Sequence, residues 1–168
     1  LGDIAYIGLE MLQHRGQDAC GVYFSDFEKG EIIKGVGSVD NVLNKENIKK
    51  IRGNIFIGQT RYPTTKSKEE SQPLSTPDFL ISMVHNGHIY NDEEIRKFYK
   101  EKGIEFKTGI DLESILFVFY EEYIKNGSIE EGVKKIFERL KGAYSVLGII
   151  KNDTLIAFKD PYGIRPLF

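Results

Sequence analysis

The sequence predicts an α+β fold in which the strands are antiparallel. Short β-prone runs come in neighbouring pairs, and the segments with helical periodicity follow one another in groups. Strands that pair with their neighbours, together with helices in runs, are typical of a layered arrangement of sheets and helices. The chain has 168 residues, which is the length of one domain, so we expect a single domain over residues 1–168.

The first half of the chain predicts helices around a hairpin and a buried strand. The opening helix has Ile4, Ile7, Met11 and Leu12 at helical spacing, and Asp3 is available as its N-cap. The expected elements are a helix over 3–13, a hairpin formed by strands at 21–24 and 31–34, a short helix over 47–52, and a strand over 54–61.

The second half begins with a long irregular stretch between Tyr62 and Pro77, rich in Pro, Ser, Thr and charged residues. A loop of this length inside a domain is usually a binding loop or a lid, or else it is disordered. Ser128 and Glu131 have the spacing of a capping box. The expected elements are a strand over 79–84, helices over 92–102, over 111–125 and from 128 onward, and a closing hairpin of strands at 144–150 and 154–158.

Composition and charge exclude several classes of protein. The chain is 40% hydrophobic and 29% charged, as expected for a globular protein, and its net charge of -2 without a basic block argues against a nucleic-acid partner. No apolar run approaches the roughly 20 residues of a membrane span, and no signal peptide is recognisable. The single cysteine, Cys20, excludes an internal disulfide and indicates a reducing cytoplasm.

The run His85-Asn86-Gly87-His88 between two apolar segments has two interpretations. Asn-Gly between strands is the strongest short signal of a two-residue hairpin. The Asn86 carboxamide and the Gly87 N–H could also donate two hydrogen bonds to a developing oxyanion, and the two interpretations are compatible. A metal site is not expected, because residues three apart on a strand point to opposite faces and the chain has only three histidines.

Two charged residues are candidates for binding a zwitterionic substrate. Arg61, at the end of a predicted strand, could clamp a carboxylate through two parallel hydrogen bonds, or it could form an ordinary surface ion pair. Asp111 could bind an ammonium group, or it could cap the helix that begins beside it. Cys20 has small neighbours and a strand after it, so we expect a buried, unreactive thiol rather than a nucleophile.

Four motifs occur in a fixed order along the chain. They are Gln-His-Arg-Gly-Gln-Asp at 13–18, Gly-Gln-Thr-Arg-Tyr-Pro-Thr-Thr at 58–65, Lys-Gly-Ala-Tyr-Ser at 141–145 and Asp-Pro-Tyr-Gly-Ile-Arg-Pro-Leu at 160–167. With these motifs the chain resembles the class II glutamine amidotransferases, whose nucleophile is an N-terminal cysteine, and within them the amidophosphoribosyltransferases. The resemblance covers essentially the whole chain.

The resemblance implies a fold and a set of roles. The fold would be a four-layer αββα sandwich of the N-terminal-nucleophile hydrolase type. Arg61 and Thr64 would hold the glutamine α-carboxylate, and Asp111 the α-ammonium. Asn86 and Gly87 would form the oxyanion hole. Two further residues, Arg15 and Gly16, would support the surroundings of the nucleophile, and the loop after Arg61 would close over glutamine.

The resemblance also implies what the sequence lacks. In the family a cysteine opens the mature protein and attacks the carboxamide, whereas this sequence begins at Leu1. We therefore expect a glutaminase domain truncated at both ends, without its nucleophile and its first strand. The phosphoribosyltransferase domain of the family, which would use Mg²⁺ with phosphoribosyl pyrophosphate, is expected beyond Phe168, and no cofactor is expected within these residues.

The expected function is glutamine hydrolysis for a transferase of pentosyl groups. Ammonia released by this domain would form phosphoribosylamine in the first step of purine synthesis, in a cytoplasmic enzyme that is expected to be a homo-oligomer. Two alternatives stay open at this point. The glutaminase could serve another acceptor, such as a sugar phosphate, or the chain could be a non-catalytic module that binds glutamine.

Overall fold

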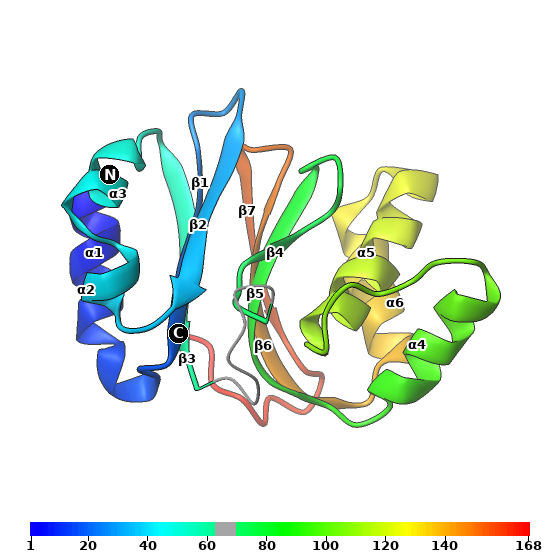
Figure 1. Ribbon diagram of the computed structural model, residues 1–168. Helices are drawn as coiled ribbons and strands as arrows, with labels where there is room; N and C mark the ends of the chain where they lie inside the picture. The colour runs from blue at the N-terminus through cyan, green and yellow to red at the C-terminus, as the bar shows by residue number, and fades with distance from the viewer. Residues whose placement is uncertain (63–69) are drawn as a thin grey trace. The chain divides into compact units, whose positions relative to one another are not determined.

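The structure is a computed structural model that describes residues 1–62 and 70–168 (Figure 1). It contains one three-stranded and one four-stranded sheet together with helices, which confirms the predicted α+β class with antiparallel pairing. The chain divides into two compact units. One consists of Leu1–Val84 with Gly148–Ile156, and the other of His85–Leu147 with Ala157–Phe168.

The three-stranded sheet lies in the first unit, in the order β2-β1-β3. Its central strand β1 (Ala19–Ser25) is antiparallel to both β2 (Gly30–Val36) and β3 (Ile55–Arg61), so the predicted hairpin and the predicted strand ending at Arg61 are confirmed. All seven residues of β1 are buried. A strand covered on both faces explains why its sequence is almost continuously apolar.

Three helices cover one face of this sheet, α1 (Gly2–Met11), α2 (Val39–Val42) and α3 (Lys45–Lys50) (Figure 1). Alternate side chains of β1 point toward them, as the two-residue period of a strand requires. The core between the helices and the sheet consists of Ala5, Leu9, Cys20, Val22, Phe24, Val39, Val42, Leu43 and Ile51.

Helix α1 presents the opposite face to the one that its hydrophobic spacing suggested. Ile4, Ile7 and Met11 are 65%, 57% and 73% exposed, whereas Ala5 and Leu9 are buried. The predicted N-cap is also wrong, because the helix is preceded by Leu1 and Asp3 lies in its first turn. Small residues let the helix approach the sheet closely, and this requirement decides which face turns inward.

The four-stranded sheet has the order β4-β5-β6-β7. Its strands are β4 (Leu74–Ser75), β5 (Ile81–Ile89), β6 (Gly142–Ile150) and β7 (Thr154–Lys159). Strand β4 lies within the stretch that was predicted to be irregular, and it pairs with β5 through Leu74 and Ser75. The predicted closing hairpin is confirmed, and positive φ angles of 51° at Lys151 and 66° at Asn152 form its turn.

The remaining α-helices of the described residues lie in the second unit: α4 (Asp92–Glu101), α5 (Leu112–Asn126) and α6 (Ile129–Arg139). Ser128 accepts a hydrogen bond from the Glu131 N–H and so caps α6 as predicted. The Glu121 carboxylate of α5 accepts hydrogen bonds from Tyr99 and Lys102. Burial acts to raise the pKa of Glu121, but these contacts outweigh it and lower the pKa to about 2.

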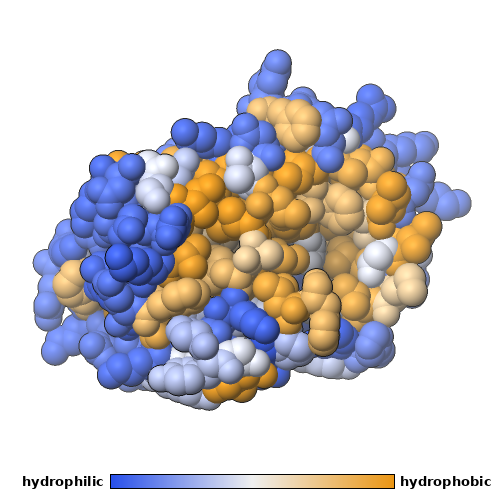
Figure 2. Space-filling model, turned by 180° about the vertical axis from the view of Figure 1, so that it is seen from behind, coloured by the Kyte–Doolittle hydropathy of each residue, from blue (hydrophilic) through white to orange (hydrophobic). Residues whose placement is uncertain are grey.

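Several large hydrophobic side chains remain at the surface, among them Tyr90, Tyr162 and Ile164. Figure 2 shows that hydrophobic residues gather on the face seen from behind. Exposed apolar atoms are ordinary in folded proteins, so we assign no function to this surface. Within residues 1–62 and 70–168, no helix has both the length and the hydropathy of a membrane span.

Candidate functional site

The first cluster of predicted site residues surrounds the end of strand β3 in the first unit. The short helix η1 (Gln13–Arg15) follows α1 and leads into Gly16, which lies against the backbone of Arg61. A Cβ atom on Gly16 would come within 2.4 Å of the Arg61 Cα, which is closer than real Cβ contacts come. Only glycine therefore fits at position 16 while Arg61 keeps its place.

Hydrogen bonds fix the segment before Gly16. The Gln13 side chain donates to the Gly16 carbonyl oxygen at 2.5 Å and accepts from the Val39 N–H at 2.7 Å. The Thr60 hydroxyl donates to the Leu12 carbonyl oxygen at 3.0 Å. The structure thus gives Gln13, the first residue of the 13–18 motif, a local reason for its identity, since one carboxamide supplies both the donor and the acceptor.

Arg61 is half-buried, and its Nη1 donates to the carbonyl oxygen of Glu70 at 3.0 Å. Arg15 is exposed. The structure therefore brings Arg15, Gly16 and Arg61 together. Thr64, the predicted partner of Arg61, and the start of the loop after it lie outside the described residues, in the gap at 63–69.

The second cluster lies on strand β5, in the second unit. Asn86 and Gly87 are within the strand, so the prediction of a two-residue hairpin at this dipeptide is wrong. Gly87 has φ +149°, and a Cβ at this position would lie 2.0 Å from the Ala143 carbonyl oxygen. Glycine is needed at position 87 because strand β6 approaches closely. The neighbouring residue, Asn86, is exposed.

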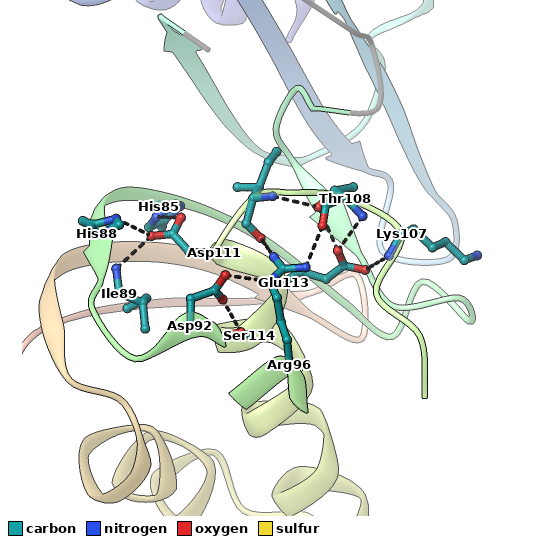
Figure 3. Close-up of polar contacts among 11 residues, drawn as sticks. His85, His88, Ile89, Asp92, Arg96, Lys107, Thr108, Asp111, Glu113 and Ser114 are labelled. Carbon is teal, nitrogen blue, oxygen red and sulfur yellow. Dashed lines mark hydrogen bonds and ion pairs between the residues drawn. The ribbon is translucent and has the colours of Figure 1, made fainter. Parts of the chain in front are cut away.

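Asp111 stands at the N-cap position of α5, but its side chain does not cap the helix. Its carboxylate instead contacts strand β5 (Figure 3). Oδ2 accepts a hydrogen bond from the Ile89 N–H at 2.8 Å, and Oδ1 lies 3.0 Å from Nε2 of His85. The Nδ1 atom of His88 lies 3.4 Å from Oδ2. Between the two interpretations of Asp111, these contacts argue against the simple cap.

These contacts keep Asp111 ionised. Its side chain is only 16% exposed, and this burial acts to raise its pKa. The contacts with His85, with the Ile89 N–H and with His88 favour the charged form more strongly, so the pKa of Asp111 is lowered to about 2. At neutral pH the second unit therefore carries a fixed negative charge beside Asn86 and Gly87.

Two neighbouring charged side chains hold the loop that delivers Asp111 (Figure 3). Glu113, which is buried, accepts hydrogen bonds from the N–H groups of Lys107 and Thr108, both at 2.8 Å. Arg96 donates to the carbonyl oxygens of Thr108 and Ile110 at 2.7 and 2.8 Å. The loop before α5 is thus fixed by side chains at both its N–H and its C=O groups, which positions Asp111 rigidly.

Cys20 has the environment that the sequence predicted. It is 1% exposed in the core beneath α1, and burial raises its pKa to about 12. A thiol with such a pKa is almost entirely protonated at neutral pH and is a poor nucleophile. Among the described residues, no group of three or more His, Cys, Asp or Glu side chains has the arrangement of a metal site.

His85 is the residue that the sequence interpretation missed. It was considered only as a metal ligand, and the two histidines were expected on opposite faces of a strand, yet both lie beside Asp111. The positive φ of Gly87 between them interrupts the regular alternation of side chains. The structure thus brings together His85, Asn86, Gly87 and Asp111 in the second unit, while the convergence of this cluster with that of Arg61 stays a prediction.

Comparison with known proteins identifies the family. A family model described as a glutamine amidotransferase domain matches residues 59–168. The chain belongs to this family. The matched range contains strand β5, the Asp111 loop and the helices α4, α5 and α6, and it confirms the resemblance to the glutamine amidotransferases.

Two curated relatives of this amidotransferase domain are both named amidophosphoribosyltransferase. An amidophosphoribosyltransferase of Pyrococcus horikoshii is 40% identical over 166 residues, which are 96% of this chain and 36% of the relative. That of Methanocaldococcus jannaschii is 38% identical, with 96% of this chain and 35% of the relative covered. The chain therefore spans about a third of the length of the curated relatives that it matches.

Solved structures support the same conclusion. The glutamine phosphoribosylpyrophosphate amidotransferase of B. subtilis, complexed with ADP and GMP, superposes with a TM-score of 0.86 at 31% identity, and the match covers 98% of this chain and 36% of that one. A structure described as the allosteric regulatory enzyme of purine biosynthesis gives a TM-score of 0.89 at 30% identity, with the same coverage. The amidotransferase domain thus has the N-terminal-nucleophile hydrolase type of fold that the resemblance implied.

Proposed function

We propose that this chain is the glutaminase domain of an amidophosphoribosyltransferase. It would hydrolyse glutamine to glutamate and ammonia, and the ammonia would be used to form phosphoribosylamine at the start of purine synthesis. Two findings support the proposal: the match to the glutamine amidotransferase family, and relatives that are named amidophosphoribosyltransferases over 96% of this chain.

The observation that carries the glutamine site is the charge on Asp111 beside the Asn86-Gly87 segment. An ionised carboxylate, 16% exposed, is suited to bind the substrate α-ammonium group. The exposed carboxamide of Asn86 and the N–H of Gly87 are donors suited to the carbonyl oxygen of the substrate side chain. Glutamine has an ammonium group and an amide in one small molecule, so both features suit it.

The first unit would supply the groups for the rest of the substrate. Arg61, with Thr64, would bind the α-carboxylate, because a guanidinium can donate two parallel hydrogen bonds to it. Arg15 and Gly16 would support the surroundings of the nucleophile. The closeness of Gly16 to the Arg61 backbone supports a shared role, since a side chain at position 16 would displace Arg61.

The reaction would be an acyl transfer through a thioester. A cysteine thiolate attacks the side-chain carbonyl carbon, and the tetrahedral oxyanion accepts hydrogen bonds from Asn86 and Gly87. The amide nitrogen then takes up the proton that the thiol lost, the C–N bond breaks and ammonia leaves, and water hydrolyses the thioester to glutamate and the free thiol. Cys20 is not this thiol, because it is buried and its pKa is raised to about 12.

Further properties of the full-length protein remain predictions. Mg²⁺ with phosphoribosyl pyrophosphate would bind to a phosphoribosyltransferase domain, whereas the glutamine reaction in this chain would need no cofactor. A homo-oligomer and a cytoplasmic location are also expected.

The test uses the full-length protein and separates the proposal from its alternatives. Ammonia release from glutamine is measured with phosphoribosyl pyrophosphate or with a hexose phosphate as the acceptor. The proposal expects glutamine-dependent phosphoribosylamine with the first acceptor. Amination of the sugar phosphate instead would support another acceptor, and glutamine binding without ammonia release would identify a non-catalytic binding module.

A further inference from the structure

Asp111 is held to strand β5 at two points that enclose the Asn86-Gly87 segment. One oxygen of its carboxylate lies 3.0 Å from Nε2 of His85, and the other accepts the Ile89 N–H at 2.8 Å (Figure 3). His85 comes directly before Asn86 along the strand, and Ile89 follows after Gly87 and His88. The carboxylate and the amide donors are therefore parts of one rigid arrangement rather than of two independent segments.

We propose that His85 is a positioning residue for glutamine: its imidazole fixes the Asp111 carboxylate in the orientation that receives the substrate ammonium group. This inference rests on the proposed function, because it takes Asp111 as the ammonium site. His85 itself does not touch the substrate. It acts through Asp111 and sets the distance between the ammonium anchor and the donors at Asn86 and Gly87.

Burial distinguishes His85 from His88, the second histidine beside the same carboxylate. The side chain of His85 is 4% exposed, whereas that of His88 is 69% exposed and its contact with Asp111 is longer, at 3.4 Å. An exposed charge contact contributes little because water screens it and the side chain can leave. A buried imidazole keeps one orientation, so it can hold the carboxylate in place.

The position of Asp111 explains why a second support is needed. The residue precedes α5 and does not cap it, so the helix does not fix its side chain. With only the Ile89 N–H as a partner, a carboxylate can still rotate about that single hydrogen bond. The ion-pair contact of His85 with the other oxygen restricts this freedom before the substrate arrives, which lowers the entropy cost of binding.

An ordinary buried histidine that only fills the core would behave differently. Its loss would lower stability and weaken the binding of every ligand alike. A positioning role affects only ligands that carry the ammonium group. The test therefore compares glutamine with glutaramate, which has the same carboxylate and carboxamide but lacks the α-amino group.

The experiment measures kcat/KM of the full-length protein for the two substrates and takes their ratio as the preference for glutamine. His85→Ala should lower this preference by about 10- to 100-fold, since displacement of a binding group by about 1 Å can cost a factor near 100. His85→Gln should preserve it within about 3-fold, because the Gln amide nitrogen reaches the position of the imidazole Nε2. His88→Ala is the matched comparison and should also preserve it.

Asp111→Asn separates a failure of this inference from a failure of the proposed site. If Asp111→Asn abolishes the preference and His85→Ala retains it, His85 has no positioning role. If Asp111→Asn itself retains the preference, Asp111 is not the ammonium site. The proposed glutamine site and the positioning role of His85 are then both wrong. If His85→Ala does not fold, His85→Asn replaces it. The shorter amide of Asn does not reach the Nε2 position, so a preference equal to that of His85→Gln would overturn the inference.

Discussion

Gly16 lies so close to Arg61 that a Cβ atom at position 16 would come within 2.4 Å of the Arg61 Cα. The two residues lie in motifs far apart in the sequence, which the Asp18 N–H also joins by donating to the Arg61 carbonyl oxygen at 3.3 Å. The Gly16 carbonyl oxygen also accepts a hydrogen bond from the Gln13 side chain. Gly16 is therefore held by Gln13 and packed against Arg61.

Gly16→Ala is expected to displace Arg61 and to weaken glutamine binding. Crowding of this kind typically destabilises a protein by about 1–3 kcal/mol. Calorimetric titration with glutamine and thermal unfolding would measure the two effects. Gly8→Ala is the control, since its Cβ would meet no atom within 4 Å, and alanine in an exposed helix should raise stability by up to about 1 kcal/mol. Equal glutamine affinities for both variants would contradict the assignment.

Arg61→Ala is expected to raise KM for glutamine sharply in the full-length enzyme. Loss of a charge-assisted clamp on a carboxylate should cost about 2–5 kcal/mol of binding free energy. Steady-state kinetics would measure it, with Arg52→Ala as a control because Arg52 is exposed and its guanidinium donates to the nearby Lys49 carbonyl oxygen. An unchanged KM would remove Arg61 from the glutamine site.

Asn86→Ala is expected to lower kcat and to leave glutamine affinity nearly unchanged. An oxyanion donor acts mainly on the transition state, and removal of one such donor costs about 100- to 1,000-fold in kcat. Single-turnover measurements of ammonia release would separate this step from binding. Asn126→Ala, at an exposed residue of α5, provides the comparison. A rise in KM with an unaltered kcat would assign Asn86 to ground-state binding instead.

Asp111 should make the stability of the protein depend on pH in the acid range. Its folded-state pKa of about 2 lies below the ordinary 3.8, so its contribution is complete above pH 3.8 and is lost as the pH falls toward 2. The contribution is about 2 kcal/mol. Urea unfolding at pH 5 and pH 2 should show a larger loss for the wild type than for Asp111→Asn. Asp3→Asn, at an exposed carboxylate, should follow the wild type.

The class of the fold could be predicted because hydrophobic spacing and turn residues are local signals. The inward face of α1 could not, since Ile4 and Ile7 follow the same helical period as Ala5 and Leu9, and only the packing against the sheet distinguishes them. For the same reason the Asn86-Gly87 dipeptide was read as a hairpin. A strand far along the sequence, with Ala143 against Gly87, decides its conformation.

The candidate site was predictable in its residue types but not in its contacts. The sequence left Asp111 open between a helix cap and a ligand for an ammonium group, because both roles use a carboxylate before a helix. His85 carried no signal of its own, since nothing local indicates that a histidine on a strand meets an aspartate beyond the next helix. A contact between side chains that are distant in sequence is set by the packing of the folded chain, so local sequence patterns do not predict it.

The attachment of Asp111 to strand β5 also limits how the specificity of this domain could be re-engineered. An amide one methylene shorter, such as asparagine, would need its amino group and its carbonyl to be bound closer together. Inserting or deleting a residue between His85 and Ile89 would turn every later side chain of the strand to the opposite side. A designer would therefore do better to introduce a new acidic residue elsewhere than to shift the existing one.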